Sequence, residues 1–147
     1  MALVERDGEV RSYHVANVTA KTLRPIIVQT ASHKSYLMTD EAKHYTKIGK
    51  EFYGHGTVNH SADEYVRGVF WHTNTRENYF SILKRGIYGV YYHVSEAHLN
   101  RYLAEFDFRY SNRANLGVND ELRAEKAIVG MIGKRLTYRW IDQSQNA

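Results

Sequence analysis

The sequence predicts an α/β protein in which a mixed sheet is flanked by helices. Strand-like and helix-like segments alternate along the chain, in the order strand, strand, helix, strand, helix, strand, helices, and this alternation is typical of layered α/β folds. The 147 residues are 43% hydrophobic and 13% aromatic, which is enough apolar material for the core of one domain. Charged residues make up 24% and proline occurs once, as in a folded chain rather than a disordered one.

Four short strands are expected. The first two form a hairpin, because Asp7-Gly8 between them is a strong signal for a two-residue turn. The third is a short apolar run that Asp40 closes, and the fourth lies among turn residues. The expected strands cover residues 2–5, 10–15, 35–39 and a short segment around 57–59.

Helices are expected wherever apolar residues recur three and four positions apart. The first contains Pro25, which is compatible with a helix if Thr22 is the cap, because the N–H groups of the first turn have no partner inside the helix. Gly86 and Gly89 are expected to interrupt the third helix, and Ser95 to cap the fourth. The expected helices cover residues 19–30, 41–45, about 73–85, 95–110 and 120–129.

The composition also narrows the class of function. Without cysteine, disulfides and cysteine-ligated zinc are excluded. No apolar run approaches the ~20 residues that span a bilayer, and acidic Glu5 and Asp7 do not fit a signal peptide. A cytoplasmic protein without a membrane partner is therefore expected. The net charge of +4 is compatible with a nucleic-acid partner and does not require one.

The helix that Thr73 or Thr75 caps displays a carboxylate and an ammonium along one edge. Glu77 and Lys84 are seven positions apart, so they lie two turns and roughly 10 Å from each other on the flank of its apolar side. Taken alone, a solvated pair on an amphipathic helix is the simpler interpretation. The apolar side consists of Tyr79, Phe80, Ile82, Leu83 and Ile87.

Asp40 is the second candidate, since ligands of open α/β sheets bind at the carboxyl ends of strands. The alternative is that Asp40 caps the short helix that follows it. If Asp40 and Glu77 converge, they offer the hard oxygen ligands that Mg²⁺ and Mn²⁺ prefer, as phosphoryl transfer by metal ions requires. Lys84 would then contact a DNA phosphate.

Several motifs, in order, resemble the insertion-sequence DDE transposases, and in particular the branch with a lysine seven residues after its last catalytic acid. The resemblance extends over residues 2–139 and is strongest at the central helix. The motifs are Tyr36-Leu-Met-Thr-Asp40-Glu, Gly54-His-Gly-Thr-Val-Asn-His-Ser, His72-Thr-Asn-Thr-Arg-Glu-Asn-Tyr-Phe-Ser-Ile-Leu-Lys-Arg-Gly86 and the segment from His93 to Tyr110.

The resemblance implies a ribonuclease H-like sheet that lacks its first strand. In this mapping Asp40 is the second catalytic acid, Glu77 the third and Lys84 the trailing lysine, and the interval of 37 positions between the acids fits the family. Asp40 and Glu77 are thereby implied to hold Mg²⁺ or Mn²⁺. No residue matches the first catalytic Asp. The chain is expected to be a truncated catalytic domain (residues 1–139) with a polar tail (140–147), and a DNA transposase of impaired activity.

The implied partners are DNA, as transposon ends and target, and a second copy in a homodimer. The residues expected to contact DNA are His72, Asn74, Lys84 and Arg85. A non-catalytic remnant that binds DNA or dimerises is the alternative, because basic residues concentrate in the second half of the chain and their phosphate contacts need no chemistry. The further basic residues are Arg101, Arg109, Arg113, Lys134, Arg135 and Arg139.

Histidines and tyrosines offer weaker alternatives. A zinc site of His44, His55, His60 and His72 lacks a clear third ligand, because His55 and His60 flank a strand and point in different directions. A nuclease of another fold would need a tyrosine beside two converging histidines. Three further tyrosines, near Lys84 and Arg85, either stack on DNA bases or form a partly buried cluster. They are Tyr88, Tyr91 and Tyr92.

Overall fold

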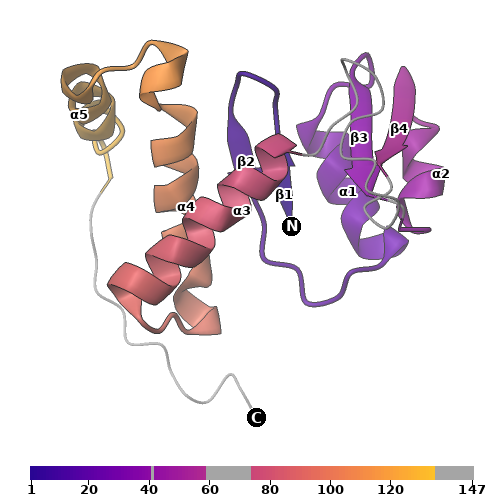
Figure 1. Cartoon of the computed structure of the whole chain (residues 1–147), viewed down its shortest axis with the longest axis horizontal. Coiled ribbons are helices and arrows are strands. Elements are labelled where there is room, and N and C mark those ends of the chain that lie inside the picture. Colours follow the sequence, from indigo (N-terminus) through magenta and orange to yellow (C-terminus); the bar gives the residue numbers. More distant parts are fainter. Residues whose placement is uncertain (41, 59–73, 135–147) are drawn as a thin grey trace. The chain divides into compact units, whose positions relative to one another are not determined.

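The computed structural model describes residues 1–40, 42–58 and 74–134. In these ranges the chain forms two two-stranded sheets and five α-helices, so the predicted α/β class is confirmed (Figure 1). The four predicted strands form two separate pairs, where a single mixed sheet was expected. The chain divides into two compact units, Met1–Ser111 and Asn112–Ala147. Both sheets belong to the first unit.

The first sheet is the predicted hairpin of β1 (Ala2–Val4) and β2 (Val10–Ser12), which pair antiparallel. Main-chain hydrogen bonds extend the pairing beyond both ends. Met1 and Tyr13 exchange two bonds of 2.8 Å, and the Glu5 N–H donates to the carbonyl of Glu9 at 2.8 Å. The loop is therefore one residue longer than predicted, and Asp7 in it has φ = 52°, a left-handed conformation that aspartate tolerates.

The second sheet pairs β3 (Tyr36–Asp40) with β4 (Gly54–Val58) in parallel. Parallel strands need a crossover connection, and this one contains the short helix α2 (Tyr45–Gly49). The strand predicted at residues 35–39 is confirmed, and the fourth strand begins three residues before the predicted segment at 57–59. The predicted helical turn at residues 41–45 is displaced toward the C-terminus.

The N-cap of helix α1 (Ala20–Thr30) lies three residues before the one expected from the position of Pro25. Thr19 is the N-cap, because its side-chain oxygen accepts the Thr22 N–H at 3.3 Å. The prediction that Thr22 is the cap is wrong, and Pro25 lies inside the helix. Since proline has no N–H, the carbonyl of Lys21 loses its intrahelical partner. Both residues are exposed, so this carbonyl stays accessible to solvent.

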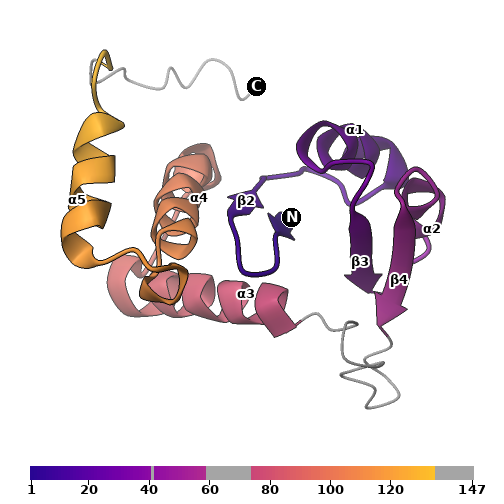
Figure 2. The ribbon, with the colours of Figure 1, turned by 90° about the horizontal axis from the view of Figure 1, so that it is seen from above.

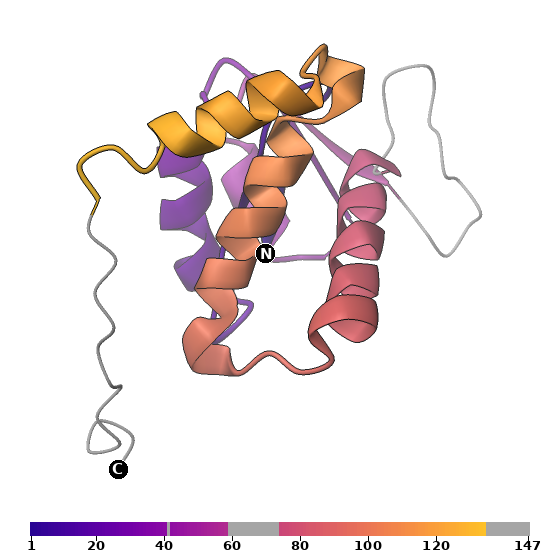
Figure 3. The same cartoon turned by 90° about the vertical axis from the view of Figure 1, so that its left-hand side faces the viewer.

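Helix α3 (Asn74–Gly86) is followed by α4 (Glu96–Ser111), and the two run in opposite directions (Figure 3). The glycines do not interrupt α3 as predicted, because the helix continues into a π-helical turn, Ile87–Tyr91. A side chain at Gly86 would collide with the ring of Phe106 on α4. Glycine at this position therefore permits the two helices to approach closely.

Strand β1 contributes to two separate apolar cores. Its even-numbered residues, Ala2 and Val4, pack against the cluster formed with α3 and α4. Met1 and Leu3 pack against the other cluster, which β3 joins through Leu37. Because successive residues of a strand point to opposite faces, β1 lies between the two cores. The buried residues of the first core are Val10, Tyr79, Leu83, Leu103 and Tyr110, and those of the second are Leu23, Ile27, Ile48 and Phe52.

The outer edge of β2 is closed by side chains of α4. The Val10 N–H donates to the Ser111 hydroxyl at 3.0 Å, and the Ser12 N–H donates to Asp107 Oδ2 at 2.7 Å. The phenol of Tyr79 donates to Asp107 Oδ1 at 2.6 Å and lies 2.7 Å from the Ser12 hydroxyl. Burial, and then the bond to Asp107, raise the pKa of Tyr79. These contacts satisfy main-chain donors that a sheet edge otherwise leaves open.

The second unit contains a short 3-10 helix (Ala114–Leu116) and α5 (Asp120–Val129). Asn119 caps α5 by accepting the Leu122 N–H at 2.8 Å, and the predicted bounds of this helix are confirmed. None of the helices that the structure describes is long and apolar enough to span a bilayer.

Candidate active site

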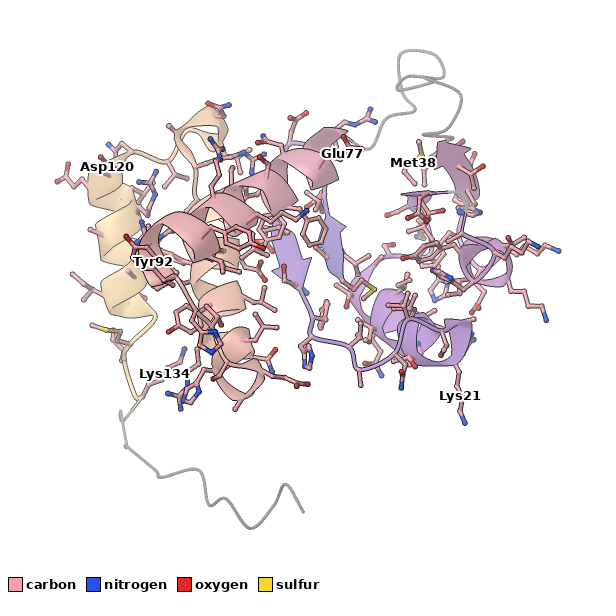
Figure 4. The ribbon with its side chains drawn as sticks, turned by 60° about the horizontal axis from the view of Figure 1, so that its bottom comes forward. Lys21, Met38, Glu77, Tyr92, Asp120 and Lys134 are labelled. Carbon is pink, nitrogen blue, oxygen red and sulfur yellow. The ribbon has the colours of Figure 1, made fainter. Side chains whose placement is uncertain are left out.

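Helix α3 presents the predicted carboxylate and ammonium on its exposed edge. Tyr79 and Leu83 are buried on its other side, while Glu77 and Lys84 are both exposed. The predicted amphipathic arrangement of this helix is confirmed. Figure 4 shows Glu77 near the start of α3, where the helix dipole favours a carboxylate.

Glu77 and Lys84 border the same open hollow, of about 590 Å³. Its lining among the described residues also includes Ser81 and Arg85 of the next turns. A carboxylate at one end and two cations at the other suit a ligand that brings both a metal ion and anionic oxygens. The ester of a phosphate is such a ligand. The complete described lining is Glu77, Phe80, Ser81, Lys84 and Arg85.

Asp40 is the last residue of β3, as its predicted position at a strand end requires, and it is half-buried. Its Oδ1 accepts the N–H of Ala42 at 3.2 Å. This local bond is the kind that aspartate makes in turns, so Asp40 has part of the structural role that was the alternative to metal binding.

The convergence of Asp40 and Glu77 stays a prediction. The parallel pairing of β3 and β4 brings their carboxyl ends to one edge, and the connection from β4 to α3 (residues 59–73) lies outside the described residues. In residues 1–40, 42–58 and 74–134 no group of three or more His, Asp or Glu side chains is placed to hold a metal ion. A metal site in this part of the chain therefore depends on two carboxylates, or on ligands from elsewhere.

His55 of β4 belongs to the surroundings of Asp40, a role that the sequence did not indicate. The Thr39 hydroxyl donates to the Asp40 carbonyl at 2.9 Å and lies 2.9 Å from Nε2 of His55. Because a hydroxyl has one proton to donate, its oxygen accepts from Nε2–H of His55 in this arrangement. His55 lies near Asp40 because the register of the two strands sets it opposite Leu37. This register cannot be predicted from the sequence.

We expect His55 to make the stability of the protein depend on pH. Burial lowers the pKa of His55, so the folded state favours the neutral ring. This stabilisation is present above the unfolded pKa of about 6.5 and is lost as the pH falls through the lower folded-state pKa. Urea unfolding of the His55→Gln variant should show a shallower loss of stability below about pH 6.5. Parallel curves for variant and parent at all pH values would contradict the assignment.

The candidate DNA contacts are only partly described. Lys84 and Arg85 are exposed in the last turn of α3. His72 lies outside the described residues, and so does the side chain of Asn74, the first residue of α3. Arg109 pairs with Glu105 at 2.9 Å. The contact of these residues with DNA stays a prediction.

Neither the zinc site nor the tyrosine nuclease gains support from the described histidines. The ring of His44 packs on Tyr45 at 4.3 Å, and His55 bonds Thr39. The other two candidate ligands, His60 and His72, lie outside the described residues.

The three tyrosines after α3 differ in their surroundings. Tyr91 donates to Glu105 at 2.7 Å and packs edge-on against Tyr102, with 4.6 Å between ring centroids. Tyr88 and Tyr92 are 75% and 81% exposed. Tyr91 therefore belongs to a partly buried cluster, and only Tyr88 and Tyr92 are exposed enough to stack on a DNA base.

A family model for the ISXO2-like transposase domain matches residues 1–111. The chain belongs to this family. The matched range coincides with the first compact unit, Met1–Ser111, so Asp40, Glu77, Lys84 and Arg85 all lie within the transposase domain. The resemblance to insertion-sequence transposases is confirmed. No match is found among the curated proteins or the solved structures.

Proposed function

We propose that this transposase domain cleaves DNA strands and transfers them to a target, with a divalent metal ion bound by Asp40 and Glu77. The observation that carries the proposal is the hollow along α3, where Glu77 lies with Lys84 and Arg85. A ribonuclease H-like arrangement, a catalytic domain that extends to residue 139 and a homodimer are parts of the same proposal.

The proposed reaction is a displacement at a DNA phosphate in which each residue has a separate role. A water or a DNA 3′-hydroxyl attacks the phosphorus, and the bond from phosphorus to the leaving oxygen breaks. Lys84 and Arg85 bind the non-bridging phosphate oxygens and hold the strand in place. Mg²⁺ or Mn²⁺, when bound, stabilises the negative charge on the attacking and leaving oxygens.

Two carboxylates make a weak metal site. Mg²⁺ requires near-octahedral oxygen coordination, and the sequence has no match for the first catalytic acid. We infer that the chain by itself has impaired transposase activity. A third carboxylate ligand from outside the described residues would increase that activity.

Metal binding by the chain alone tests the site. Titration with Mn²⁺, followed by electron paramagnetic resonance, should give a dissociation constant that rises roughly tenfold or more in both Asp40→Asn and Glu77→Gln, because each change removes a charged ligand. The matched control is Glu121→Gln, an exposed carboxylate on α5, which should leave the affinity unchanged.

The non-catalytic alternative predicts a different outcome. The bond from Ala42 to Asp40 favours it, since that bond gives the carboxylate a structural role. Equal Mn²⁺ affinity in all variants, together with DNA binding that weakens steeply with salt and ignores Mg²⁺, would contradict the metal site and support a DNA-binding remnant.

A further inference from the structure

Two exposed tyrosines meet at the end of the second sheet that lies away from Asp40. Tyr36 is the first residue of β3, and Tyr53 directly precedes Gly54, which is the partner of Tyr36 in the parallel register. Figure 2 shows β3 and β4 side by side with their arrowheads at the same end, so both tyrosines lie at the opposite end. Along β3, Tyr36 is roughly 13 Å from Asp40.

The local packing holds the two tyrosine rings against each other. Gly54 has no side chain, and a Cβ atom there would collide with the ring of Tyr36. The rings of Tyr36 and Tyr53 meet edge to face, with 5.1 Å between their centroids and 86° between their planes. The Tyr53 N–H donates to the carbonyl of His33 at 2.8 Å. This bond ties the segment that precedes β4 to the one that precedes β3.

Both rings stay open to solvent. Tyr36 is 61% exposed and Tyr53 is 72% exposed. Their hydroxyls form no hydrogen bond with any of the described residues, whereas the phenols of Tyr79 and Tyr91 donate to carboxylates. A pair of exposed aromatic rings offers a flat ligand a surface on which to stack.

The charges near the two tyrosines favour an anionic ligand. Lys34 lies in the turn that leads into β3, and Lys50 is the C-cap of α2, three residues before Tyr53. Both lysines are exposed, and neither forms a salt bridge with the part of the chain that the structure describes. The carboxylate of Glu51 accepts two bonds of 2.7 Å from Arg24. Its charge is therefore balanced, which leaves the lysine charges uncompensated.

Aromatic rings beside lysines suit a single-stranded nucleic acid, because its bases stack on the rings while ammonium groups bind its phosphates. A duplex is less suitable, since the faces of its bases are covered by the neighbouring pairs in the stack. A proline-rich polypeptide also docks on exposed aromatic side chains, but it has no use for the two cations.

We propose that Tyr36, Tyr53, Lys34 and Lys50 bind a single strand of DNA, at a surface separate from the hollow along α3. One base stacks on the exposed ring faces, and the lysines bind neighbouring phosphates. The binding needs no metal and no residue of the hollow, so it does not rest on the proposed reaction. Such a surface holds a strand that has been separated from its complement.

Binding of a fluorescein-labelled oligothymidylate to the full chain in EDTA, followed by fluorescence anisotropy, tests the stacking. Tyr53→Ala should weaken binding roughly fivefold or more, because one base loses its aromatic partner. Tyr53→Phe keeps the ring and should bind as tightly as the parent. The Mn²⁺ affinity of Tyr53→Ala should equal that of the parent, which separates failure of this proposal from failure of the metal site.

The salt dependence of the same binding tests the phosphate contacts. Lys50→Gln should reduce the slope of the logarithm of affinity against the logarithm of salt concentration by roughly 0.7, the contribution of one phosphate contact in a single strand. Lys21→Gln is the matched control, since it removes one exposed lysine from the start of α1. Its slope should equal that of the parent.

Photo-crosslinking locates the bound strand directly. A strand that contains 5-iododeoxyuridine should become attached to Tyr36 or Tyr53, as read by mass spectrometry of the digested chain. No measurable binding of oligothymidylate, or equal affinity in Tyr53→Ala and the parent, would overturn the proposal. An equal effect of Tyr53→Ala on a duplex would also contradict it, because paired bases cannot stack on the rings. Binding of a polyproline peptide that only Tyr53→Ala abolishes, with oligothymidylate unaffected, would assign the surface to a proline-rich polypeptide instead.

Discussion

Replacing Glu77 by glutamine should abolish DNA strand cleavage in a chain extended at its N-terminus by a strand that carries an aspartate. The added carboxylate completes a three-acid site, and the substitution then removes one charged ligand while keeping the size of the side chain. We expect a loss of roughly 100-fold or more, the scale on which removing one electrostatic group at a transition state acts. The measurement is Mg²⁺-dependent cleavage of labelled DNA.

The control for this experiment is Glu121→Gln in the same extended chain, because Glu121 lies on α5, outside the matched domain. Its activity should equal that of the parent. Unchanged cleavage in Glu77→Gln would remove Glu77 from the reaction and, with it, the catalytic proposal.

Asp107→Ala should produce the largest loss of stability of any polar substitution in the first unit. Its carboxylate accepts both the Ser12 N–H and the Tyr79 phenol, and the Tyr79 ring is fully buried. The substitution leaves the Ser12 N–H without its acceptor and the Tyr79 phenol with the Ser12 hydroxyl alone, which should lower the free energy of unfolding by about 2–3 kcal/mol. The midpoint of urea unfolding reports the change.

Glu105→Ala is the matched control on the same helix. Glu105 also accepts a phenol, but from half-buried Tyr91 rather than fully buried Tyr79, and it pairs with exposed Arg109. Its loss should cost less than about 1 kcal/mol, as for other partly exposed pairs. Equal losses in the two variants would show that Asp107 does not hold α4 against β2.

Helical periodicity was the most dependable signal in this sequence. It predicted the buried side of α3, with Tyr79 and Leu83, and hence the exposed positions of Glu77 and Lys84. It also predicted α5 to its last residue. These features follow from the 3.6-residue repeat and from local caps, which depend on neighbours in the chain.

Local rules failed where a second element decided the outcome. Gly86 reads as a helix stop, but α3 is followed directly by a π-helical turn, and the absent side chain leaves room for Phe106 of α4. Pro25 suggested a late cap, yet Thr19 caps α1 and the proline is accommodated on an exposed face. Packing explains the glycine, whereas the proline is tolerated because its side of α1 is exposed.

The sequence by itself determined the family, the class of fold and the edge of α3 on which Glu77 and Lys84 lie. Only the tertiary structure decided that Asp107 and Ser111 close β2 and that His55 reaches Thr39. The physical reason is distance along the chain. The contact of Ser12 with Asp107 joins residues 95 positions apart, and such contacts depend on how whole elements pack rather than on any local pattern.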